Sequence, residues 1–300
     1  MQKDYTIKVY DLSNTFERVL SPNIVMSGVS FSETINGWQG QLSVRLKLPF
    51  GTDQIGYNNI LRVYETDSEH SPRLIYSGIV GNITRVLENA GEYIDVRCVG
   101  LASLLSFFYF YQSWSYTFTK SQAGDLTIEN IITYFSTKYP GLLSYTAGSL
   151  DTASSVSIDF DYTKCLDAIK NVSDAISTWY WYIWPDGVVQ FHSRSTVGTL
   201  HKVQVGRQIE KITVEENAEK ICNKRMVAYT SGVATVSDAT SITDNGLREL
   251  YVDYSTRYGS SSASATTDAT NFVAQNKDEK RKITVELNSE YDIESIRAGD

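Results

Sequence analysis

The feature that most constrains this chain is the run 41–48, in which polar and apolar side chains alternate without a break. Its four apolar residues at even positions share one face of an extended strand, and the polar residues share the other. A register shift of one residue would bury the polar face, so the alternation predicts a sheet with one covered face. The pair Asn36-Gly37 precedes the run and favours a hairpin, because both residues tolerate positive φ.

The rest of the first hundred residues also has the pattern of an antiparallel meander. Strands are expected at about 59–65, 73–77, 79–87 and 93–99, with turns between them. The composition agrees, since 12% of the residues are aromatic and large flat side chains pack well on a pleated surface. Closely spaced strands of this kind predict a barrel or a sandwich.

The middle third adds helices. Apolar residues at helical spacing predict one helix ending near Lys138 and a second beginning near Thr163. A hairpin with the turn Pro185-Asp186-Gly187 follows the second helix. The last third returns to strands, at about 200–205, 209–215, 224–230, 248–254 and 281–287, with a short helix that Asp238 caps and Gly246 closes. The predicted class is therefore α+β, mainly β.

Charge and cysteine content exclude some function classes. The net charge is -8, and it is spread along the chain without a basic stripe, so affinity for nucleic acid is not expected. Cys98, Cys165 and Cys222 are isolated and predict buried or free thiols in a chain folded in a reducing compartment. The start of the chain lacks an apolar core, and no long apolar run follows, so neither a signal peptide nor a membrane-spanning helix is expected.

The sequence contains no recognisable catalytic motif. It has no G-x-S-x-G, no P-loop and no G-x-G-x-x-G, and its three histidines lack metal-ligand spacing. We therefore expect no enzyme, no cofactor and no metal site. Asp159 and Asp161 share one face of a predicted strand, where they either bind a cation, act as acid and base, or form a solvated face. A cell-wall hydrolase that uses Asp159, Asp161 or Asp174 remains an alternative.

The densest aromatic segment is the hairpin itself. Trp179, Trp181 and Trp184, with Tyr180 and Tyr182, stand within six residues. One interpretation is a stacking platform for a sugar or a protein, which would make the chain a carbohydrate- or receptor-binding module. The other is a hairpin wedged between helices and buried on both faces. Trp179, Trp181, Trp184 and Tyr182 are the predicted interaction patch.

Several segments together resemble a known family. The segment 31–40, FSETINGWQG, and the alternating strand after it resemble the opening hairpin of tailed-phage baseplate hub and tail-tip proteins. Segments 74–78 with 93–105, then Gly246-Leu247-Arg248-Glu249, and 277–284 with 291–300, are similar to later pieces of the same family in the same order. The family pattern continues into another strand after the final Gly-Asp, so we expect either a longer native chain or a partner at this end.

The resemblance implies an architecture and a role. Two tail-tube-like antiparallel β-barrel domains, at 1–105 and 196–300, would flank a smaller α+β domain at 106–195 that carries the aromatic hairpin. Three copies would form a pseudo-sixfold ring that caps or continues the tail tube and adapts sixfold to threefold symmetry. The implied location is the tail tip of a virion or phage tail-like particle, after synthesis in the bacterial cytoplasm.

The resemblance also implies partners. Besides two further copies of itself, the chain would contact distal tail or tail-tube rings, the tape measure protein, and tip spike or receptor-binding proteins. DNA would pass through the lumen without specific binding, and no stable membrane insertion is expected.

Overall fold

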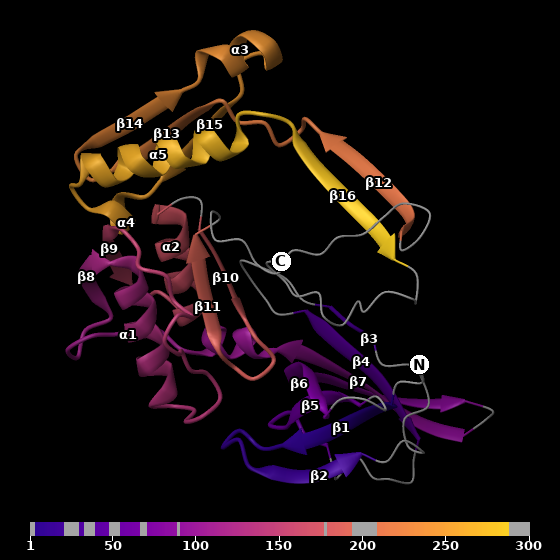
Figure 1. Ribbon diagram of the computed structural model, residues 1–300. Helices are drawn as coiled ribbons and strands as arrows, with labels where there is room; N and C mark the ends of the chain where they lie inside the picture. Colours follow the sequence, from indigo (N-terminus) through magenta and orange to yellow (C-terminus); the bar gives the residue numbers. More distant parts are fainter. Residues whose placement is uncertain are drawn as a thin grey trace.

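The structure is a computed structural model that describes residues 4–20, 30–32, 40–47, 55–66, 71–88, 91–176, 179–193 and 209–287. Strands predominate, and helices are concentrated after residue 100, so the predicted α+β, mainly-β class is confirmed (Figure 1). No described helix has the length and apolar character needed to cross a membrane.

In the described part of the first hundred residues, seven strands form one antiparallel sheet. The predicted alternation in β4 is confirmed, since Leu42, Val44 and Leu46 are buried and their neighbours are not. β3 pairs with β4 so that Ser30 faces Ser43, as a hairpin centred on Asn36-Gly37 requires, although that pair lies outside the described residues. In the order β2-β1-β5-β6-β7-β4-β3, the strands are β1 (Asp4–Tyr10), β2 (Phe16–Leu20), β3 (Ser30–Phe31), β4 (Gln41–Lys47), β5 (Ile60–Thr66), β6 (Arg73–Glu88) and β7 (Gly91–Gly100).

β6 differs from the prediction of two strands at 73–77 and 79–87. It is a single strand that stays paired with β7 through a register shift between Val80 and Asn82. A bulge of this kind admits one extra residue and bends the strand without ending it. Near the bulge, β6 and β7 approach closely at Gly78. A side chain there would begin 2.6 Å from the carbonyl oxygen of Val99.

The middle of the chain packs two helices and two short ribbons onto the first sheet. Ile60 and Ile79 of that sheet lie in the same apolar cluster as Leu104, Ile131 and Trp181, so one core spans both parts. The predicted helices and the aromatic hairpin are confirmed. The elements are η2 (Leu101–Phe107, a 3₁₀ helix), β8 (Thr117–Ala123), α1 (Gly124–Ser136), β9 (Ser155–Asp161), α2 (Cys165–Ile176), β10 (Trp179–Ile183) and β11 (Val189–Ser193).

The last described part combines a two-stranded ribbon with a separate α/β unit. β12 and β16 pair with each other, and the unit is inserted between them (Figure 1). Its three strands are ordered β14-β13-β15, and α5 packs against β13 and β14. The elements are β12 (Ile209–Asn217), β13 (Lys224–Tyr229), β14 (Gly232–Ser237), α3 (Ala239–Asn245), β15 (Glu249–Asp253), α4 (Ser255–Tyr258), α5 (Ser262–Asn276) and β16 (Lys280–Leu287).

The expectation of purely antiparallel strands in 196–300 is wrong for one pair, because β13 and β15 are parallel. The connection through α3 carries the chain from β14 across to the free side of β13, and such a crossover produces parallel neighbours. The strands in the described ranges form open sheets and ribbons rather than a closed barrel. The strand predicted at 200–205 lies outside those ranges.

The helix predicted after Asp238 is confirmed in detail. The Asp238 carboxylate accepts a hydrogen bond from the Ser241 amide at 2.9 Å, which satisfies one of the free amides at the start of α3. Gly246 follows the helix with φ of 73°, a conformation that glycine adopts without strain.

Candidate functional site

The aromatic hairpin divides the predicted interaction patch between two faces. Trp181 is 1% exposed, and Trp179 packs against the same core with its ring 4.8 Å from that of Phe191. Tyr182 and Trp184 alternate with these residues along the strand and lie on the opposite face. Trp184 is 41% exposed. The four residues therefore do not form one platform, and a binding role for Tyr182 and Trp184 stays a prediction.

The outer face of the hairpin has a polar aromatic character. The rings of Tyr180 and Tyr182 are nearly parallel, with centroids 6.0 Å apart. His192 lies beside them, with Nδ1 3.2 Å from Oδ1 of Asp151 and Nε2 3.0 Å from Oε1 of Gln190. The hydrogen bond with Gln190 orients the imidazole, and its other nitrogen faces the Asp151 carboxylate. No local sequence pattern connects His192 with this face.

The three aspartates named as a hydrolase alternative meet in one hollow. A cavity of about 330 Å³ lies between β9, α2 and α4. Burial raises the pKa of Asp174, although Arg257 and Lys170 act in the opposite direction. The Thr117 hydroxyl donates to Asp161 at 3.0 Å, and Thr119 donates to Asp159. The lining residues are Asp159, Asp161, Thr163, Asp167, Lys170, Asn171, Asp174, Tyr254, Thr256 and Arg257.

The hollow is lined by negatively charged aspartates and by the positively charged Lys170 and Arg257, so it contains both hydrogen-bond acceptors and donors. In the ranges that the structure describes, no group of three or more His, Cys, Asp or Glu is arranged to hold a metal ion. Asp159 and Asp161 accept hydrogen bonds from threonine hydroxyls across the β8–β9 ribbon. Both carboxylates therefore have a structural role in pairing the two strands. The sequence correctly placed Asp159 and Asp161 on one strand.

The three cysteines are free and buried, as the sequence predicted. Burial raises the pKa of the Cys165 thiol to about 12, and it also raises the pKa values of Cys98 and Cys222. Since the thiolate is the reactive form, these side chains are held in the unreactive one at neutral pH.

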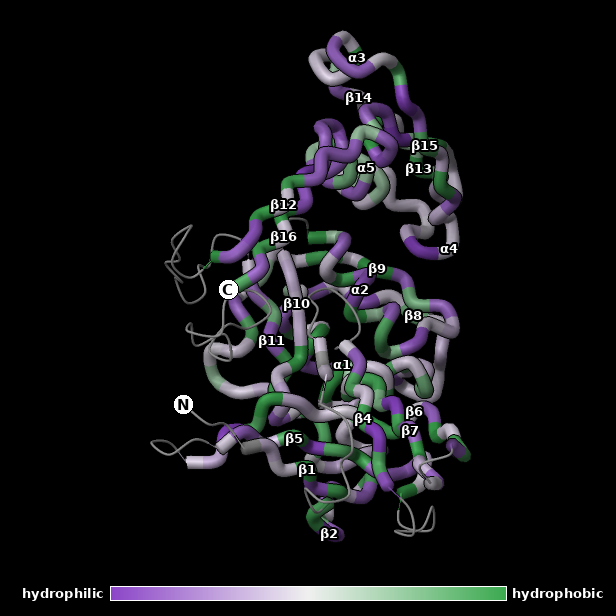
Figure 2. The backbone as a smooth tube through the Cα atoms, turned by 90° about the vertical axis from the view of Figure 1, so that its right-hand side faces the viewer, coloured by the Kyte–Doolittle hydropathy of each residue, from purple (hydrophilic) through white to green (hydrophobic). Residues whose placement is uncertain are grey.

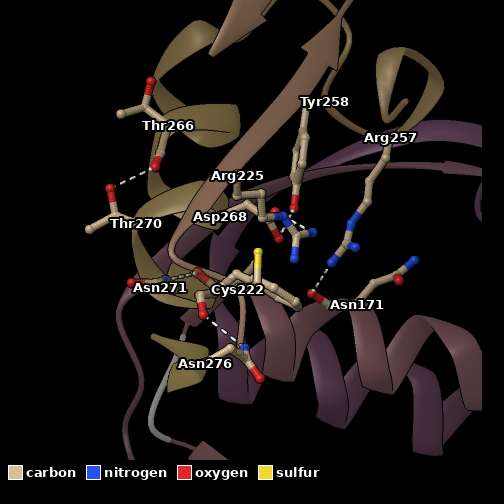
Figure 3. Close-up of polar contacts among 12 residues, drawn as sticks. Asn171, Cys222, Arg225, Arg257, Tyr258, Thr266, Asp268, Thr270, Asn271 and Asn276 are labelled. Carbon is tan, nitrogen blue, oxygen red and sulfur yellow. Dashed lines mark hydrogen bonds and ion pairs between the residues drawn. The ribbon is translucent and has the colours of Figure 1, made fainter. Parts of the chain in front are cut away.

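The inserted unit is built around a buried ion pair. Arg225 on β13 and Asp268 on α5 approach to 2.9 Å, and their side chains are 4% and 6% exposed. The Tyr258 hydroxyl donates to the same carboxylate at 3.0 Å, and the Arg225 guanidinium lies 3.8 Å from the ring centroid of Phe272. Figure 3 shows Arg225, Asp268 and Tyr258 pointing toward one another. Burial raises the pKa of Tyr258, so this hydroxyl keeps its proton.

Specific contacts attach this unit to the middle of the chain. The Arg257 guanidinium donates to the backbone oxygen of Asn171 on α2 at 2.9 Å (Figure 3). Gly259 passes so close to β9 that a side chain there would begin 2.7 Å from Oδ2 of Asp159. Within the unit itself, the Cys222 amide donates to the Asn276 oxygen at 2.8 Å and joins its two ends. These contacts join residues that are far apart in sequence, so no local sequence pattern predicts them.

The β12–β16 ribbon has one charged face and one apolar face. On the charged face, Nζ of Lys211 lies 3.0 Å from Oε1 of Glu286. A two-stranded ribbon is marginally stable alone, so its apolar face needs a cover. Figure 2 shows hydrophobic positions along this ribbon. Two cross-strand pairs form the apolar face, and their side chains are between 41% and 63% exposed: Ile212 with Val285, and Val214 with Ile283.

Comparison with known proteins places this architecture. No family profile matches the chain, and no curated protein matches it. Solved structures do match, among them prophage tail protein gp18 from Listeria monocytogenes EGD-e (TM-score 0.56, 12% identity, 94% of this chain and 81% of that chain). A tail protein from Neisseria meningitidis MC58 matches with a TM-score of 0.54 at 10% identity, over 95% of this chain and 75% of that chain.

The prophage MuSo2 43 kDa tail protein from Shewanella oneidensis gives a TM-score of 0.61 at 10% identity, over 93% of this chain and 82% of that chain. At such low identity, the likeness concerns the fold. The resemblance read from the order of short segments is confirmed at this level, and the chain has the fold of these phage tail proteins.

Proposed function

We propose that this chain is a structural protein of a phage tail, a hub at the tail tip or baseplate. In this proposal, three copies form a pseudo-sixfold ring that caps or continues the tail tube and adapts sixfold to threefold symmetry. The role is structural and not enzymatic. Its place is the tip of a virion tail or of a phage tail-like particle.

The observation that carries the proposal is the shared fold with three tail proteins. The match extends over at least 93% of this chain and at least 75% of each of theirs. A likeness of this extent includes the first sheet, the middle helices and the inserted unit together. It is therefore unlike a match to one common module, which would leave most of the chain uncovered.

The edges of the seven-stranded sheet and the apolar face of the β12–β16 ribbon support the proposed ring. Among the described strands, β2 and β3 are the edges of the seven-stranded sheet, and the β12–β16 ribbon has an apolar face that is about half-exposed. Sheet edges and apolar faces favour association, and a closed ring covers both. We propose tube-like domains at 1–105 and 196–300 on either side of the domain at 106–195, with the α/β unit as an insertion in the last.

The proposed partners follow from that position. They are two further copies of the chain, distal tail or tail-tube rings, the tape measure protein, and a tip spike or receptor-binding protein. The net charge of -8 suits a channel through which DNA passes without adhering.

Imaging tests the ring directly. We expect negative-stain class averages of the purified chain to show a threefold particle with a central channel, and light scattering to give three times 33.7 kDa. A chain that stays monomeric and forms no ring, either alone or with a tail-tube protein, would contradict the proposal.

A further inference from the structure

One tight turn holds a large aromatic side chain away from the protein. Gln112 and Ser115 exchange two backbone hydrogen bonds of 2.9 Å, so Ser113 and Trp114 are the central residues of a two-residue hairpin turn. Their φ angles are 49° and 64°, the left-handed region that asparagine and glycine usually occupy in such turns. Trp114 is 95% exposed. The fold thus keeps a bulky residue in a strained conformation whose side chain faces solvent.

Exposed tyrosines surround the base of this turn. Tyr116 and Tyr162 stack with ring centroids 5.6 Å apart and planes 15° apart, and Tyr109 meets Tyr116 edge-on at 6.5 Å. Tyr162 is 66% exposed and also has a positive φ, of 43°. Tyr109, Trp114, Tyr116 and Tyr162 are called the aromatic turn patch below.

The patch stands on a rigid base. Phe110 is 3% exposed and contacts the rings of Phe118 and Phe160 at 5.3 and 5.4 Å. Its amide also donates to the Thr163 oxygen at 2.8 Å, which ties the start of the turn to the segment that carries Tyr162. A surface that is already ordered loses little conformational entropy when a partner binds.

The charge pattern indicates what kind of partner fits. No charged residue occurs from Cys98 to Thr119, although 21% of the chain is charged. The exposed charged residues Asp161 and Lys164 lie at the rim of the patch, beside Tyr162. The central part of a protein–protein interface is depleted in charge and enriched in Tyr and Trp. Copies of a chain with a net charge of -8 repel one another, so they associate most readily through uncharged surface.

We infer that the aromatic turn patch binds a second copy of this chain, with Trp114 as the central anchor of the contact. The inference rests on the proposed assembly of several copies and names a surface through which they meet. The indole enters an uncharged part of the neighbouring copy, and the three tyrosines exclude water around it.

The test compares self-association of the full chain with that of Trp114→Asn, by sedimentation velocity between about 1 and 100 µM. Asparagine tolerates the left-handed conformation, so this change removes the indole and keeps the turn. Tyr162→Asn serves as the second variant for the same reason. Tyr251→Asn is the control, since Tyr251 is an aromatic residue that is also exposed but lies on β15 of the inserted unit.

We expect Trp114→Asn to weaken association at least about tenfold, Tyr162→Asn to weaken it less, and Tyr251→Asn to leave it within about twofold. Unchanged association in Trp114→Asn, or a wild-type chain that is monomeric throughout, overturns the inference. Imaging separates the two proposals. Rings that persist in Trp114→Asn refute the patch alone, whereas an absence of rings in every sample, with tube protein added, also counts against the hub.

Discussion

The first sheet with the middle helices and the inserted unit between β12 and β16 are stabilised in different ways. The former share large buried side chains such as Leu104, Phe160 and Trp181. In the described residues, the buried members of the apolar cluster of the latter are Val227, Tyr258 and three alanines, and smaller contacts with partly buried residues such as Val252 surround them. Where the apolar core is small, the buried pair of Arg225 and Asp268 occupies the centre. The difference indicates that burial stabilises one part, while polar pairing specifies how the elements of the other fit together.

The two kinds of core should respond differently to substitution. Removing an apolar side chain loses transfer free energy and leaves a cavity. Removing one member of a buried ion pair leaves the other charge without compensation, although replacing both by apolar residues is often nearly neutral. The comparison therefore makes opposite predictions for single and double changes.

The largest effect is expected in the apolar core. Trp181→Ala should lower the free energy of unfolding by about 4 kcal/mol, because the ring is fully enclosed and its site cannot collapse completely. Urea denaturation measures the loss. Trp184→Ala is the matched control and should cost less than about 0.5 kcal/mol. Equal losses for both variants would show that the hairpin does not discriminate between its two faces.

The next effect concerns the ion pair. Arg225→Met should destabilise the inserted unit by about 3 kcal/mol, because it leaves the Asp268 carboxylate buried without its cation. Adding Asp268→Leu should restore most of that loss. Amide hydrogen exchange across 222–276 reports on this unit separately from the first sheet. A double variant as unstable as the single one would mean that the pair contributes net stability, and the comparison would then fail.

A smaller change sharpens the same point. Tyr258→Phe removes the hydrogen bond to Asp268 and keeps the ring, so it should cost about 1.5 kcal/mol. In the Arg225→Met/Asp268→Leu background the acceptor is gone, and the same substitution should cost almost nothing. Identical costs in the two backgrounds would separate Tyr258 from the network.

The smallest effect depends on pH. The Ser241 amide and Lys277 hold the pKa of Asp238 below its usual value of 3.8. A carboxyl group with a lowered pKa in the folded state contributes stability above 3.8, and this contribution disappears as the pH falls through the folded-state pKa. Asp238→Asn should keep the cap on α3 and abolish that pH dependence, as acid titration followed by hydrogen exchange would detect. An unchanged acid profile would contradict this assignment.

Much of the local structure could be predicted because its causes are local. Alternation determines which face of β4 is buried, and Asp238 and Gly246 mark the two ends of α3. β8 was missed, since Thr117–Ala123 is mostly polar and its partner strand begins more than thirty residues later. The crossover that makes β13 and β15 parallel is equally invisible, because strand direction depends on the path of the connection.

The candidate sites show the same division. The sequence identified the aromatic hairpin but grouped residues that alternation then placed on opposite faces, as Trp181 and Trp184 show. Ion pairs such as Arg225 with Asp268 join positions that only the tertiary fold brings together. The turn at Ser113 and Trp114 lacks the Asn-Gly pair that would have indicated it, so its strained geometry is apparent only in three dimensions.

The hydrogen bond between Cys222 and Asn276 has a consequence for how this polypeptide could diversify. It holds the first and last residues of the inserted unit close together. For β12 and β16, the unit is therefore equivalent to a very short connection. The pairing of β12 with β16 does not depend on the size or the sequence of the inserted unit. A lineage can therefore enlarge, shrink or exchange the inserted unit while the ribbon keeps its register.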